Sequence, residues 1–92
     1  MKEKLLKIIN HYGIINQTRK LNEECFELIE AIREYEYLRS IASRRNIVKE
    51  LTDVIVILKQ IQLYYEIEST EMTPEFQFKV DRQIGRMENE NI

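Results

Sequence analysis

The scarcity of chain-breaking residues constrains this sequence most. Two Gly and one Pro occur in 92 residues, too few turn formers for a β-sandwich. Apolar side chains recur instead at helical spacings over long stretches. Aliphatic residues are plentiful and the net charge is only −2, so the chain is not expected to be disordered. We predict an all-α fold, in which residues 1–92 form one domain built as an antiparallel bundle of about four helices.

The periodicity also predicts where each helix lies. Helices are expected at about residues 2–11, 15–37, 46–68 and 73–90, with a loop or frayed helix over residues 38–45. Thr73 and Pro74 give the fourth helix an N-cap followed by a proline at the first helical position. Its predicted inward-facing residues are Phe76, Val80, Ile84 and Met87.

The third predicted helix is the most apolar part of the chain. The β-branched run at residues 54–58 could be a buried strand, but its flanks keep helical spacing from Ile47 to Ile61. A helix that is apolar on nearly every side has to be covered on every side. Because so small a domain buries only about 60–65% of its unfolded surface, we expect the bundle to be completed by oligomerisation.

Several further expectations follow from the bulk properties of the chain. The longest apolar run is far shorter than the roughly 18–20 residues that span a bilayer, and the N-terminus lacks an apolar signal segment. A lone cysteine fits a reducing compartment. The weakly acidic balance argues against a binder of polymeric nucleic acid. We therefore expect a cytoplasmic protein that contacts neither membrane nor nucleic acid.

Two acidic clusters lie where helices are predicted. Side chains three or four residues apart share a helix face, so Glu24 neighbours Glu27, and Glu50 neighbours Asp53. Glu50 and Asp53 fall on the apolar arc of their helix, and carboxylates facing a core are costly unless their charge is offset. Several hard oxygen donors close together are the ligands that Mg²⁺ prefers. The pattern therefore predicts a magnesium site.

Other interpretations of these residues are available. The acids could instead be surface residues paired with Lys20, Arg33 or Lys49. Di-iron and zinc sites are disfavoured because His11 is the only histidine and Cys25 the only cysteine. The chain also lacks a glycine-rich phosphate loop, so metal and basic side chains would have to hold any phosphate.

The acidic motifs resemble the signature of the MazG-like family of all-α nucleotide pyrophosphohydrolases. That signature is Glu-Glu-x-x-Glu, a variable spacer, and Glu-x-x-Asp. In this chain it reads Glu23-Glu24-Cys25-Phe26-Glu27, then Glu50-Leu51-Thr52-Asp53. The resemblance covers roughly residues 13–86, including the hydrophobic run after Asp53.

The resemblance implies Mg²⁺-dependent hydrolysis of a nucleoside triphosphate between the α and β phosphates, with Mn²⁺ as a possible substitute. The implied metal ligands are Glu24, Glu27, Glu50 and Asp53, and Glu23 completes the catalytic signature. Implied phosphate contacts are Lys79, Arg82 and Arg86, and Gln17 is the implied base contact. A homodimer or homotetramer is the family expectation. Two alternatives stay open: a non-catalytic helical oligomerisation module, and a relative that hydrolyses phosphoribosyl-ATP.

Overall fold

The computed structural model describes residues 1–90 and confirms the all-α class. Its helices are α1 (Lys2–Tyr12), α2 (Ile14–Leu38), α3 (Ile41–Tyr64) and α4 (Ser69–Glu90). No strand occurs within these 90 residues. Over the same range, none of the helices combines the length and the apolarity that crossing a bilayer requires.

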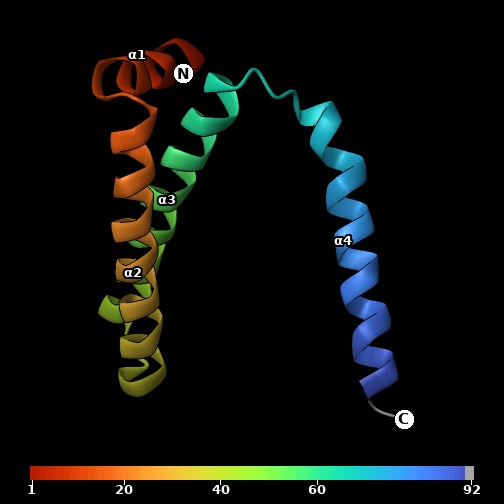
Figure 1. Ribbon diagram of the computed structural model, residues 1–92. Helices are drawn as coiled ribbons and strands as arrows, with labels where there is room; N and C mark the ends of the chain where they lie inside the picture. Colours follow the sequence, from red (N-terminus) through yellow and green to blue (C-terminus); the bar gives the residue numbers. More distant parts are fainter. Residues whose placement is uncertain (91–92) are drawn as a thin grey trace.

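Three of the helices form a packed body, called the three-helix body below. α2 and α3 run antiparallel side by side, and α1 lies across the end where α2 begins and α3 finishes (Figure 1). The buried apolar residues come from all three helices; they are Leu5, Ile9, Ala31, Val54 and Ile57. This packing fixes the relative positions of the α2 and α3 faces that carry the acidic clusters.

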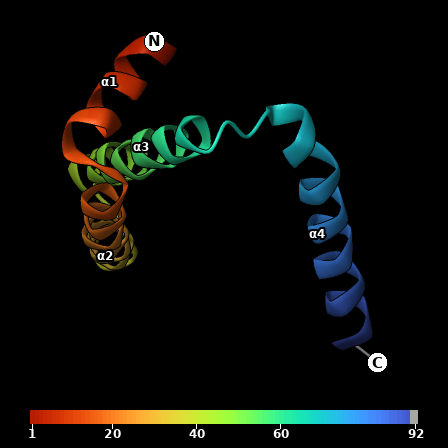
Figure 2. The same ribbon diagram turned by 45° about the horizontal axis from the view of Figure 1, so that its top comes forward.

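The fourth helix stands apart from this body in both views (Figures 1 and 2). Within residues 1–90, α4 packs against none of the other three helices. The prediction of inward-facing residues on this helix is therefore wrong for the single chain: Phe76 is 71% exposed, and Val80, Ile84 and Met87 are exposed as well. The helical spacing was correct, but no element of the same chain covers that face.

The prediction of a loop or frayed helix over residues 38–45 is also wrong, because residues 41–45 form the regular first turn of α3. Arg39 adopts the left-handed conformation, with φ of 52°, and ends α2. Ser40 then caps α3: its Oγ accepts a hydrogen bond from the Ser43 N–H at 3.0 Å, and Ser43 Oγ accepts one from the Ser40 N–H at 3.2 Å. This reciprocal pair is a capping box. The two serines therefore mark a helix start and not a loop.

The boundaries on either side of the last connector differ from the prediction in a similar way. α3 ends at Tyr64, and α4 begins at Ser69, one turn before the predicted start. The Glu68 N–H donates to Glu71 Oε2 at 2.7 Å, which is the carboxylate half of a capping box. Pro74 consequently lies inside α4, where it lacks the N–H for one backbone hydrogen bond.

Candidate metal centre and adjoining groove

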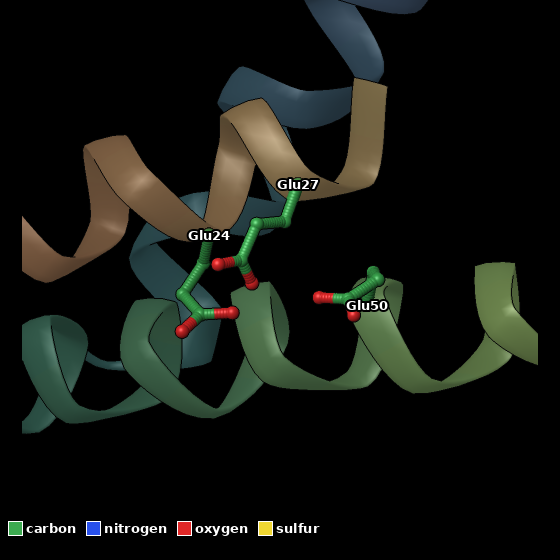
Figure 3. Close-up of side chains that lie close together, drawn as sticks. All are labelled: Glu24, Glu27 and Glu50. Atoms are coloured by element: carbon green, nitrogen blue, oxygen red, sulfur yellow. The ribbon is translucent and has the colours of Figure 1, made fainter. Parts of the chain in front are cut away.

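Three predicted ligands converge between α2 and α3. Glu24 and Glu27 project from successive turns of α2 toward Glu50 on α3 (Figure 3). One carboxylate oxygen from each residue lies within 4.8 Å of the other two. The antiparallel packing of α2 on α3 thus brings together acids that are more than twenty residues apart in the sequence.

The burial of this cluster distinguishes it from ordinary surface acids. Glu24 is 9% exposed, Glu50 is half-buried and Glu27 is exposed. The Oε2 atoms of Glu24 and Glu50 are buried without a hydrogen-bond partner among residues 1–90, an arrangement that is costly for a carboxylate. Lys20 Nζ lies 3.7 Å from the other Glu24 oxygen, so it does not satisfy Oε2. Two buried carboxylate oxygens to which no described residue donates would fit a bound metal ion.

The electrostatics agree with this geometry. Burial raises the pKa of Glu24 above its ordinary value, and the negative charges of Glu27, Asp53 and Glu50 raise it further, against the lowering effect of Lys20. The pKa of Glu50 is raised mainly by desolvation, and the neighbouring Glu27 carboxylate raises it further. Crowded carboxylates with raised pKa values are typical of functional sites.

Asp53 and Glu23 occupy the edge of the cluster. Asp53 lies one turn after Glu50 on α3 and is exposed. Its carboxylate is outside the group of three oxygens within 4.8 Å, but its charge still raises the pKa values of Glu24 and Glu50. Asp53, Glu23 and Glu24 all line one groove beside the cluster.

This groove has a volume of about 740 Å³ and is walled by α1, α2 and α3. Arg19 and Lys20 supply positive charge on the α2 side. Tyr12, Val56 and Ile57 supply an apolar wall. Acids, bases and an apolar surface therefore meet in one concave site, whose volume falls in the roughly 300–1,000 Å³ range of small-molecule pockets.

Gln17, the implied base contact, lines the groove but is largely buried. Its Nε2 donates a hydrogen bond of 2.9 Å to Oε1 of Gln60 on α3, which is only 1% exposed. Sequence reasoning missed Gln60, although a glutamine three residues after Ile57 on an apolar helix is the same signal that singled out Glu50. The paired amides join α2 to α3 beside the groove.

The basic residues that were expected to contact phosphate lie far from the carboxylate cluster. Lys79, Arg82 and Arg86 lie on α4, away from the carboxylates, and do not line the groove. Arg19 and Lys20 are the cations that line it, and sequence reasoning did not select them as phosphate contacts. The available signal was Lys20, which lies four residues before Glu24 on the same helix.

The chain matches no protein-family model, no curated protein and no solved structure. The resemblance to the MazG-like family therefore rests on the two carboxylate motifs. The function has to be argued from the chemistry of the carboxylates and of the groove.

Proposed function

We propose that this protein is a Mg²⁺-dependent nucleoside triphosphate pyrophosphohydrolase, which cleaves between the α and β phosphates to give a nucleoside monophosphate and pyrophosphate. The observation that supports this most is the pair of buried, unpartnered oxygens on Glu24 and Glu50. They belong to a three-carboxylate cluster that adjoins a groove with both cationic and apolar walls.

The donor set fits a hard divalent cation. Glu24, Glu27 and Glu50 would hold Mg²⁺ or Mn²⁺ through carboxylate oxygens. Zinc and iron sites usually include histidine or cysteine, and neither residue type belongs to this cluster. When bound, Mg²⁺ offsets the carboxylate charge, binds phosphate oxygens and lowers the pKa of water.

The remaining groove residues have roles that match a nucleotide. Arg19 and Lys20 place cations where phosphates would lie beside the carboxylates, and charge-assisted contacts of this kind are strong. Tyr12 and Val56 offer an apolar surface to the base. Asp53 lies at the groove with an exposed carboxylate, which can accept a proton from an attacking water.

The test is pyrophosphate release by the purified full chain with Mg²⁺. Substrates would include canonical and modified nucleoside triphosphates, and phosphoribosyl-ATP to cover the alternative substrate. Phosphorus NMR would establish which bond breaks. We expect Glu27→Gln to lower release by at least about 100-fold, as removal of one electrostatic group at a reacting centre does.

Glu30→Gln is the matched control, because Glu30 lies one turn after Glu27 on α2, is exposed, and pairs with Arg33 at 3.5 Å. It should retain the activity of the unmodified chain. Mn²⁺ binding followed by electron paramagnetic resonance tests the metal site independently of turnover. Metal binding without release from any substrate would contradict the enzyme proposal and favour a non-catalytic interaction module. Absence of metal binding would contradict the metal site itself.

A further inference from the structure

A pair of glutamine side chains, called the amide pair below, is buried in the wall of the groove. Gln17 on α2 is 5% exposed and Gln60 on α3 is 1% exposed. Gln17 Nε2 donates a hydrogen bond of 2.9 Å to Gln60 Oε1. Burying a primary amide is costly unless its polar atoms find partners. Each amide offers one acceptor oxygen and two N–H donors, so a single shared hydrogen bond leaves most of this capacity unused.

The unused atoms of the amide pair open onto the groove. Gln17 Oε1 and Gln60 Nε2 make no hydrogen bond with any residue in the range 1–90. Within that range, the side-chain polar atoms that are fully buried and unpartnered belong to Glu24 and Glu50 instead. The two amide atoms are therefore accessible, and both glutamines line the groove. The groove wall thus carries one acceptor and one donor next to each other.

The amide pair lies two helical turns along the groove from the acids. Gln17 precedes Glu24 by seven residues on α2, and Gln60 follows Asp53 by seven residues on the antiparallel α3. Seven residues correspond to a rise of about 10 Å. Lys20 lies between Gln17 and Glu24 and lines the same groove. A nucleotide whose phosphates lie beside Lys20 and the carboxylates would therefore direct its base toward the amide pair.

The direction of the hydrogen bond within the amide pair can be reversed. The oxygen and the nitrogen of a primary amide have nearly the same size, but one accepts and the other donates. If both amides turn by 180°, Gln60 Nε2 donates to Gln17 Oε1, and Gln17 Nε2 and Gln60 Oε1 face the groove instead. The internal hydrogen bond is kept while the donor and the acceptor exchange places. Among residues 1–90, no other hydrogen bond to either amide favours one arrangement over the other.

We propose that the amide pair binds the edge of the nucleobase and turns to match it, so that the groove accepts amino bases and oxo bases alike. This inference rests on the proposed function. An amino base such as cytosine offers an N–H donor beside a ring-nitrogen acceptor, whereas an oxo base such as uracil offers a carbonyl acceptor beside a ring N–H. The two edges have opposite polarity, and each one matches one arrangement of the amide pair. Gln60 is then a specificity-determining residue.

Binding of nucleoside monophosphates, the expected products, tests this inference without turnover. Isothermal titration calorimetry on the unmodified full chain with Mg²⁺ would compare cytidine with uridine monophosphate, and adenosine with inosine monophosphate. Within each pair, an oxo group replaces an amino group and the adjacent ring nitrogen gains a proton. We expect dissociation constants within about threefold of each other in each pair. A donor and an acceptor in fixed positions would instead favour one member by at least about tenfold, because the other leaves polar groups mismatched.

Two further measurements separate base binding from simple packing. Gln60→Met keeps a similar volume without the amide, and it should weaken binding of all four monophosphates by about tenfold. Gln77→Met is the matched control, since Gln77 is exposed on α4 and does not line the groove; it should bind them like the unmodified chain. In nitrogen NMR spectra of the side-chain amides, the donor of the internal hydrogen bond should be Gln17 in one complex of each pair and Gln60 in the other.

Four results would overturn the inference. They are a preference of tenfold or more within either pair, a Gln60→Met variant that loses affinity for only one member, a Gln60→Met variant that folds and binds all four unchanged, and no binding of any monophosphate. Failure of the proposed function gives a different result. In that case the monophosphates bind with the expected ratios, but no triphosphate releases pyrophosphate, and the amide pair then belongs to a nucleotide-binding groove without catalysis.

Discussion

The three-helix body and α4 are built from the same kind of amphipathic helix, yet their surroundings differ completely. The body buries apolar residues from α1, α2 and α3, and it also encloses polar groups: the carboxylate of Glu24 and the Gln17–Gln60 pair. No residue of α4 is buried. Helical periodicity therefore identifies the face of a helix that needs to be covered but not the surface that covers it. The carboxylate cluster and the groove beside it lie entirely within the three-helix body.

The largest contrast concerns stability. Ile9 is fully buried, at 0% exposure, so Ile9→Ala should lower the free energy of unfolding by about 2–4 kcal/mol. Phe78 on α4 is 60% exposed, so Phe78→Ala should change the free energy of unfolding by no more than about 0.5 kcal/mol. Urea unfolding followed by circular dichroism measures both. Equal losses of stability would mean that Phe78 is packed in solution, and the contrast between α4 and the three-helix body would then be wrong.

A smaller contrast concerns substrate binding. Lys20→Ala removes a cation from the groove and should raise KM about tenfold, as loss of a charge-assisted hydrogen bond does. Arg82→Ala on α4 should change KM by less than about twofold if one chain builds the site alone. Steady-state kinetics with the best substrate of the panel tests the pair. The reverse order would show that α4 of another copy reaches the groove.

The raised pKa of Glu24 gives a prediction with a definite sign. Because its folded-state pKa lies above the ordinary value, the stabilising contribution of Glu24 is present below that value and is lost as the pH rises through the folded pKa. In metal-free buffer at pH 7, Glu24→Gln should therefore melt at a higher temperature than the unmodified chain. The difference should shrink toward pH 4. Saturating Mg²⁺ should reverse the order, since ligand binding stabilises only the chain that keeps its site.

Scanning calorimetry at several pH values, with and without metal, measures all three parts of this prediction. Glu30→Gln again serves as the control and should leave the melting temperature nearly unchanged. A Glu24→Gln variant that melts lower at pH 7 without metal would show that Glu24 acts as an ordinary stabilising surface acid.

The smallest expected effect concerns the helix starts. Ser40→Ala removes the cap of α3 and should lower the free energy of unfolding by about 1 kcal/mol. Thr73→Ala should have a smaller effect, because Thr73 Oγ1 donates to Ser69 O within α4 and caps nothing. Chemical denaturation of both variants measures the two losses of stability. A loss of about 1 kcal/mol at Thr73 would place the start of α4 at Thr73, as Pro74 alone suggests.

The helices and the carboxylate cluster could be predicted because both depend on local spacing. The spacing of Glu24 and Glu27, and the position of Glu50 on an apolar arc, were enough to bring three acids together once α2 and α3 were antiparallel. The start of α3 could not be predicted, because serines such as Ser40 and Ser43 occur commonly both in turns and at helix N-caps. The position of α4 could not be predicted either. The connector before it carries hydrogen bonds from the Gln62 side chain to Ile67 O and Ser69 Oγ, which no periodicity encodes.

The tight turn at Arg39 and Ser40 has a consequence for how the protein folds. It makes α2 and α3 consecutive arms of one helical hairpin, so Glu24 and Glu27 meet Glu50 across a separation of more than twenty residues when the two arms close. Structures built from neighbouring helices typically form on the microsecond-to-millisecond scale. The carboxylates would then be crowded together as soon as the hairpin closes. Divalent cations should therefore accelerate closure of the hairpin, and the rate of that step should not depend on chain concentration.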